Sequence, residues 1–264
     1  MNRKALAAVV LCLMLSTAGY VAAAHPFSAG EKLQYGILAA GFPVGKQTIE
    51  LSGTGDFLGQ PVYNLYGRSR TSGLLSIFYR LDDKWHVFMD RDSILPVRVE
   101  KDMKEGQKEG YYVYDIDQAD RRVIIHNLKD NNIKTVQAEN TVFDLFSLIY
   151  FYRKDPSVFD REFTFDFLEP NDVHTVHFRN EGLTEIKIDR ISRYDEIPCI
   201  KLQQIGGVGI EIYVGSDELR LPLKLVVPSK LPRDRELIVE FVLEKYAPGE
   251  DQPDPPRLYR HILK

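Results

Sequence analysis

The residues that could carry out chemistry are few and scattered, and the first to consider is a pair of histidines. His174 and His177 lie three positions apart in 173–179, a stretch with the composition of a strand. Successive side chains of a strand point to opposite faces, so positions i and i+3 cannot share a metal ion without a bulge. Cys-x-x-Cys, His-Glu-x-x-His and phosphate-loop patterns are absent from the sequence. We therefore predict no metal site and no cofactor.

No constellation for nucleophilic or acid–base catalysis stands out either. His86 follows the single tryptophan, Trp85, in a strand-like stretch, and His126 borders a turn. No Gly-x-Ser-x-Gly pattern occurs. The run Gly206-Gly-Val-Gly209 has no helix after it, so it predicts a hairpin turn rather than an anion site. The adjacent carboxylates Asp82-Asp83 predict a solvated strand edge. We predict no catalytic residues and a protein that is not an enzyme; a cleft joining a histidine to a carboxylate would favour an enzyme.

One segment, 142–153, differs from the rest of the chain because it is apolar on nearly every side. Asp144, Ser147 and Arg153 are its only clearly polar side chains, which predicts a buried helix. At about 12 residues it falls short of the roughly 20 that cross a bilayer. Thr141 is the predicted N-cap, with Asp144 in the first turn and a basic pair in the last, before Pro156.

The elements around this helix are strands, about seven on each side by their alternation of apolar and polar residues. Many of the inward positions are aromatic. The sequence predicts a mainly β (α+β) fold, a long curved antiparallel sheet or half-barrel with helix 142–153 on its concave face. The segment 88–99 resembles 213–225, since each has an aromatic-ended strand, a turn with an aspartate, and Leu-Pro before the next strand. One barrel and two similar lobes therefore both remain open.

The beginning of the chain predicts export. Residues 1–24 combine Arg3-Lys4, an apolar run and Ala22-Ala-Ala24, the pattern of a signal peptide cleaved near Ala24. We expect a periplasmic protein with no transmembrane segment after this removal. Loss of Arg3 and Lys4 from the 34 basic residues leaves 32 against 38 acidic ones, and no basic stripe is present, which argues against nucleic acid as a partner. Cys199 is then the only cysteine and is predicted to be a buried thiol.

The end of the chain is predicted to be separate from the main domain, which spans 25–246. Residues 247–264 begin with a proline-rich acidic stretch and finish with a short basic tail. Such a composition predicts an extended linker. The tail is either frayed or docked on the domain, or it is a docking peptide for a partner.

Several motifs together resemble a known exported bacterial family, domain of unknown function 3108. They are Phe27-x-x-Gly-Glu-x-Leu-x-Tyr35, Gly41-x-x-x-Gly45, Leu95-Pro-Val-Arg-Val99, Glu105-Gly106 and Asp144-Leu-x-Ser-Leu-Ile-Tyr-x-x-Arg153. The resemblance covers roughly 27–243 and implies no catalytic residues. At the level of fold, the chain also resembles the periplasmic lipoprotein-carrier half-barrels, whose apolar concavity takes acyl chains.

These patterns lead to a hypothesis of ligand binding. We expect a non-enzymatic periplasmic protein that binds an apolar or lipid-like ligand in the half-barrel cavity. The alternative is an envelope structural or assembly factor that contacts other envelope proteins through sheet edges or the tail. The candidate ligand-lining residues are Phe143, Phe146, Ile149 and Tyr150 from the helix and Tyr63, Trp85 and Phe88 from the strands.

Overall fold

The computed structural model describes residues 25–73, 80–188, 196–231 and 235–250, together with residues 252, 256, 259 and 261–263. The predicted signal peptide, residues 1–24, lies outside the described residues.

The described strands form a single sheet of 15 strands, rather than two separate lobes. Its order is β8-β7-β6-β5-β4-β3-β2-β1-β15-β14-β13-β12-β11-β10-β9, so β8 and β9, which are consecutive in sequence, lie at opposite ends. Neighbouring strands pair antiparallel except β9 and β10, which are parallel. The bounds are β1 Lys32–Ala39, β2 Phe42–Phe57, β3 Gln60–Thr71, β4 Asp82–Asp90, β5 Pro96–Glu105, β6 Lys108–Asp117, β7 Arg122–Asn127, β8 Asn132–Gln137, β9 Val142–Phe143, β10 Glu162–Glu169, β11 Asp172–Ile186, β12 Ile197–Gln204, β13 Glu211–Gly215, β14 Pro222–Leu231 and β15 Arg235–Ala247.

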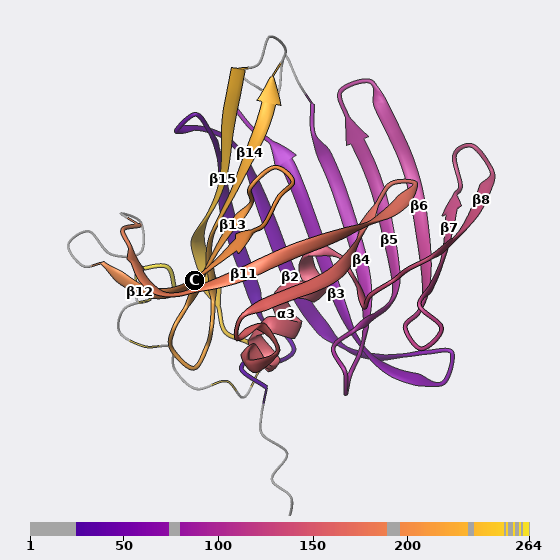
Figure 1. Ribbon diagram of the computed structural model, residues 1–264, viewed down its shortest axis with the longest axis horizontal. Helices are drawn as coiled ribbons and strands as arrows, with labels where there is room; N and C mark the ends of the chain where they lie inside the picture. Colours follow the sequence, from indigo (N-terminus) through magenta and orange to yellow (C-terminus); the bar gives the residue numbers. More distant parts are fainter. Residues whose placement is uncertain are drawn as a thin grey trace, which may run out of the picture.

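The sheet is strongly curved, and helix α3 (Leu145–Lys154) lies on its concave side, followed by the short 3-10 helix η1 (Pro156–Phe159). Figure 1 shows β10 and β11 running across the front of the curved sheet. The predicted mainly β fold, an unclosed curved antiparallel sheet around one apolar helix, is confirmed.

The helix begins three residues later than predicted, because Val142 and Phe143 pair with β10 as a short strand. The N-cap is Asp144 rather than Thr141. Its side chain accepts hydrogen bonds from the backbone N–H groups of Phe146 and Ser147, and the Ser147 hydroxyl accepts from the N–H of Asp144, which completes a capping box. Arg153 and Lys154 occupy the last turn as expected.

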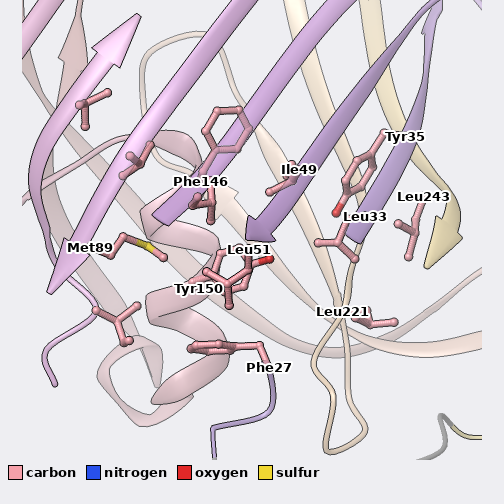
Figure 2. Packing of buried hydrophobic residues seen from close by; sticks show 14 of the residues in the cluster. Phe27, Leu33, Tyr35, Ile49, Leu51, Met89, Phe146, Tyr150, Leu221 and Leu243 are labelled. Carbon is pink, nitrogen blue, oxygen red and sulfur yellow. The ribbon is translucent and has the colours of Figure 1, made fainter. Parts of the chain in front are cut away.

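The helix fits closely against the sheet through a glycine in β3. A Cβ atom at Gly67 would lie 2.6 Å from the ring of Phe146, so only glycine leaves room for that ring. Figure 2 shows Phe146 and Tyr150 among inward side chains of β1 to β4, such as Ile49 and Met89. Leu148 and Tyr152 lie in a second core cluster, formed with strands of the C-terminal half.

The two matching sequence segments form similar hairpins within the one sheet. Ile94 and Arg220 each adopt a positive φ (62° and 47°), and each is followed by Leu-Pro, with the proline at the start of β5 or β14. Both hairpins have a register shift just before the turn. The sequence match therefore reflects one hairpin geometry used twice.

Strand β11 is longer than the sequence suggests. We expected a break after residue 179, but the strand continues to Ile186 through a bulge between Asn180 and Gly182, where Gly182 has a φ of 88°. A glycine with positive φ inside a strand is typical of a bulge as well as of a turn.

The connection from β8 to β9 is held by a carboxylate. Asp166 accepts hydrogen bonds from the N–H groups of Glu139 (2.7 Å) and Asn140 (3.1 Å), and from the hydroxyl of Thr175 (2.8 Å). Gln118 brackets Val142, donating to its carbonyl and accepting from its N–H. These bonds tie the two ends of the sheet into one unit.

The described part of the tail is docked on the domain. Tyr259 and Ile262 are buried, and the N–H of Tyr246 donates to the carbonyl of Ile262 (2.7 Å). The hydroxyl of Tyr259 bonds to Asp217. This region is therefore part of the core in its described residues, rather than a separate extended segment.

Candidate ligand-binding site

Helix α3 borders hollows of very different size. Two of them have a volume of about 20 Å³ each, enough for about one water molecule. A third has a volume of about 160 Å³, similar to the roughly 150 Å³ of an engineered protein cavity that takes up benzene. This third hollow, which we call the inner cavity, is the one beside the helix with room for an organic guest.

The inner cavity lies between the N-terminal end of α3, the concave face of β2 to β6 and the β10–β11 turn. Most of its wall is apolar or aromatic, which suits an apolar guest. The lining residues are Gln47, Trp85, Val99, Lys101, Tyr114, Asp144, Leu145, Phe146, Phe167, Leu168, Glu169 and Pro170.

A small polar cluster lies on the same wall. The Lys101 ammonium lies 5.2 Å from the centre of the Trp85 ring and 3.5 Å from the Asp83 carboxylate. Burial and the neighbouring Asp83 raise the pKa of Glu105, which lies 4.0 Å from Lys101. Gln47 accepts a hydrogen bond from the hydroxyl of Ser69 (2.8 Å). The positive charge of Lys101 is therefore already neutralised by carboxylates.

Asp144 contributes an oxygen with no hydrogen-bond partner. Its Oδ1 accepts from the N–H groups of Phe146 (2.8 Å) and Ser147 (3.4 Å). Its Oδ2 is the one buried side-chain nitrogen or oxygen among the described residues without a partner. Burial raises the pKa of this carboxyl, against the hydrogen bonds that lower it. Asp144 lines the inner cavity, but its Oδ2 is itself buried by protein atoms and is not accessible from the cavity.

A second polar cluster lies at the C-terminal end of α3, and its side chains all have hydrogen-bond or ion-pair partners. Arg153 and Glu31 form an ion pair of 2.5 Å with both side chains completely buried. Arg153 also donates to the carbonyls of Leu219 (3.0 Å) and Pro26 (2.9 Å), and Tyr150 donates to Glu31 (2.9 Å). With every group partnered and no exposed surface, this pair joins the helix to the first strand instead of offering a site.

A larger hollow, of about 920 Å³, is on the opposite face of the sheet. We call it the outer groove. It lies between the tip of the β2–β3 hairpin and the outward side chains of β4 to β7. Arg98 bonds to Glu100 (2.9 Å) and Asp115 (2.7 Å) in its floor. The Arg98–Asp115 pair joins β5 to β6, and such cross-strand ion pairs are typical of a solvated sheet face.

The seven candidate residues do not line one cavity. Trp85 and Phe146 meet at the inner cavity, with ring centres 5.3 Å apart. Ile149 borders the two smallest hollows. The prediction that Phe88 lines the ligand cavity was wrong. Phe88 points to the opposite face from Trp85 and lines the outer groove.

The other three candidate residues pack in or against the core and do not line the inner cavity. Phe143 packs in the second core cluster, against Phe165 at 5.7 Å. Tyr150 is held by Glu31, and Tyr63 packs edge-on to Phe27 with ring centres 6.2 Å apart. Sequence reasoning missed Lys101, Tyr114 and Phe167. Strand register places Lys101 opposite Trp85 and Tyr114 opposite Val99, and Phe167 reaches the same cavity from β10.

The remaining polar candidates lie apart from one another. His174 pairs with Glu169 (3.1 Å) and His177 with Thr164 (2.9 Å), on opposite faces of β11. His86 and His126 are on the outer face, and His126 lies 3.6 Å from Asp115. Within the described ranges no group of three or more His, Cys, Asp or Glu side chains could hold a metal ion.

Cys199 is fully buried, and burial raises its pKa to about 11.

Among the helices of the described residues, none has the length and apolar character that crossing a membrane requires.

Comparison with known proteins identifies the family. The pattern of the family described as "Protein of unknown function (DUF3108)" matches residues 32–232. The chain belongs to this family. No curated protein matches this chain.

Solved structures give a likeness of fold. The crystal structure of a beta-barrel-like protein of domain of unknown function DUF1849 from Brucella abortus has a TM-score of 0.53 and 9% sequence identity, over 83% of this chain and 98% of that chain. At this identity the likeness concerns the fold alone. A DUF1329 family protein from Desulfovibrio piger has a TM-score of 0.24 and 7% identity over 87% and 89% of the two chains.

Proposed function

We propose that this DUF3108 protein is a non-enzymatic periplasmic protein that binds one small apolar ligand in the inner cavity. The observation that carries the proposal is a hollow of about 160 Å³ bounded by Trp85, Phe146 and other apolar side chains, next to a helix whose two other hollows have only about 20 Å³ each. An apolar molecule gains by leaving water for such a wall.

The volume of the inner cavity limits the size of the ligand that it can hold. Pockets for drug-sized molecules have volumes of roughly 300–1,000 Å³, about twice that of the inner cavity or more. We therefore take the occupant to be a single ring or a short chain rather than a whole lipid. The periplasmic location is supported by the signal-peptide pattern of residues 1–24.

The single tryptophan provides a direct test. Trp85 is the only tryptophan in the chain and forms part of the cavity wall, so its fluorescence reports on occupancy. We expect methylcyclohexane to change the emission of the wild-type protein in a saturable manner. Val99→Phe, which places a ring in the cavity, should abolish the change.

A matched control lies on the other face of the same strand. Phe88→Leu alters the outer groove without touching the inner cavity, so its titration should equal that of the wild type. A saturable response that survives Val99→Phe but is lost in Phe88→Leu would place binding in the outer groove and refute the proposal.

A second function, assembly through protein contacts, is favoured by the edge strand β8. This strand pairs with β7 on one side, and nearly all its side chains are exposed. A free edge can accept a strand from a partner. If this is the function, Ile133→Lys should lose an envelope partner that the wild type and Val99→Phe both capture.

A further inference from the structure

The hydroxyl of Tyr114 is a hydrogen-bond donor without an acceptor on the strand wall of the inner cavity. It forms no hydrogen bond within the described residues, and the one fully enclosed side-chain nitrogen or oxygen there without a partner is Oδ2 of Asp144. The Tyr114 hydroxyl is therefore not enclosed but reaches open space. Because Tyr114 is only 2% exposed and lines the inner cavity, this space is the cavity.

The ammonium of Lys101 is a second donor of the same kind. Its distances of 3.5 Å to Asp83 and 4.0 Å to Glu105 exceed the roughly 2.7–2.9 Å of a direct charge-assisted hydrogen bond. Among the described residues it donates no hydrogen bond, and it is not enclosed, so its N–H groups are accessible too. The ammonium lies over the ring of Trp85, and both side chains line the inner cavity.

Strand register brings the two donors together. Lys101 pairs with Tyr112 and Val99 pairs with Tyr114, so Lys101 and Tyr114 are diagonal neighbours across β5 and β6. Diagonal neighbours on one face are roughly 7–8 Å apart, a distance that long side chains bridge. One small guest can therefore meet both donors.

We propose that the ligand of the inner cavity carries a neutral carbonyl group, as a small cyclic ketone does, whose oxygen accepts hydrogen bonds from the Tyr114 hydroxyl and the Lys101 ammonium while its apolar part packs against Trp85 and Phe146. This inference rests on the proposed function of the cavity and names its ligand class.

The wall favours a neutral acceptor over a charged group. Burial raises the pKa of Tyr114, so its hydroxyl keeps its proton and donates. An ammonium on the ligand would bring donors to a wall of donors. A carboxylate would meet Asp144 and Glu169 on the same wall, while the charge of Lys101 is already balanced. A carbonyl oxygen accepts two hydrogen bonds and brings no charge to bury.

The first test removes the Tyr114 hydroxyl and keeps its ring. By isothermal titration calorimetry, we expect Tyr114→Phe to bind cyclohexanone about fivefold more weakly than the wild type does, because one hydrogen bond is lost. Methylenecyclohexane has the same shape with a CH₂ group in place of the oxygen, so its affinity should be unchanged. Lys101→Met removes the other donor and should weaken cyclohexanone binding about tenfold, since a bond from a charged group is stronger.

The matched controls lie on the same two strands but outside the inner cavity. Tyr111→Phe removes a hydroxyl that donates to Glu100 (3.3 Å) on the outer face, and Lys104→Met removes an ammonium 3.9 Å from Asp102. Both controls should bind cyclohexanone and methylenecyclohexane as the wild type does.

The outcomes separate this inference from the proposed function. Cyclohexanone affinity unchanged in Tyr114→Phe, or reduced equally for methylenecyclohexane, would overturn the carbonyl assignment and leave apolar binding intact. Cyclohexanecarboxylate that binds more tightly than cyclohexanone would overturn it in favour of an anion. If neither ring compound binds the wild-type protein, the proposed function itself fails. If Lys101→Met does not fold, Tyr114→Phe still decides, because it removes an oxygen that no described residue binds.

Discussion

At the scale of single residues, the Glu31–Arg153 pair should dominate stability. Removing one member leaves a buried charge without its partner, which costs about 3–5 kcal/mol. We expect Glu31→Gln to lower the free energy of unfolding by this order, measured by urea denaturation.

Two variants control for this effect. The double variant Glu31→Leu with Arg153→Met should recover much of the loss, because no charge stays unpaired. Arg179→Gln, which breaks the exposed pair with Glu162, should change stability far less. Equal losses for the buried and the exposed pair would contradict our account of the buried one.

Gly67 tests the contact between helix and sheet. A methyl group at this position would meet the Phe146 ring at 2.6 Å, so Gly67→Ala should cost about 1–3 kcal/mol through overpacking. Gly55→Ala is the control in the same hairpin, because its methyl group would meet the end of the Asn64 side chain, which can move. Thermal melting of both variants measures the difference, and a Gly67→Ala protein as stable as Gly55→Ala would show that α3 packs less closely than described.

At the scale of elements, the hydrogen bonds that Asp166 accepts from the connection between β8 and β9 predict that the stability of the protein depends on pH. Burial alone would raise the pKa of this carboxyl, but hydrogen bonds from Asn140, Thr175 and Glu139 lower it overall. A lowered pKa means that the ionised form stabilises the fold above the unfolded value of about 3.9, and that this contribution is lost as the pH falls through the lower native pKa.

Asp166→Asn should therefore be less stable than the wild type at pH 7, by about 1.5–3 kcal/mol for lost hydrogen bonds to a charge. The difference should shrink as the pH falls below about 4. Urea unfolding at several pH values measures it, and a difference that stays constant down to low pH would contradict this role.

The elements also show how far sequence reasoning reaches. The buried helix was predictable because its apolar residues cover its whole circumference, but its start was not. Val142 and Phe143 fit a helix by composition, and only pairing with β10 makes them a strand. Gly182 gave the signal of a turn, while the strand register makes it a bulge.

The site was predictable only in part, for a related reason. Trp85 and Phe146 come from distant parts of the chain, and both were expected at a ligand cavity beside the helix. Phe88 was a misassignment that alternation alone argues against, since it is three residues from Trp85. Lys101 and Tyr114 depend on the pairing of β4 with β5 and of β5 with β6, which no local pattern specifies.

At the scale of the whole molecule, the curved sheet serves to surround one helix. The larger core cluster, with Phe146 and Tyr150 of α3, combines side chains from both halves of the chain, and the smaller cluster, with Leu148 and Tyr152, takes its buried strand residues from the C-terminal half. The first residues after the predicted cleavage site and the last described residues of the tail are part of this core, through Phe27 and Tyr259. The inner cavity is the space left where the helix begins and the β10–β11 turn closes over it.

The most direct test of the central claim is native mass spectrometry of the protein purified from its own envelope without detergent. We predict a population heavier than the bare chain by the mass of one small organic molecule, and loss of this population in Val99→Phe. A wild-type protein found only at the mass of the bare chain, with Trp85 emission that does not respond to methylcyclohexane, would contradict the account.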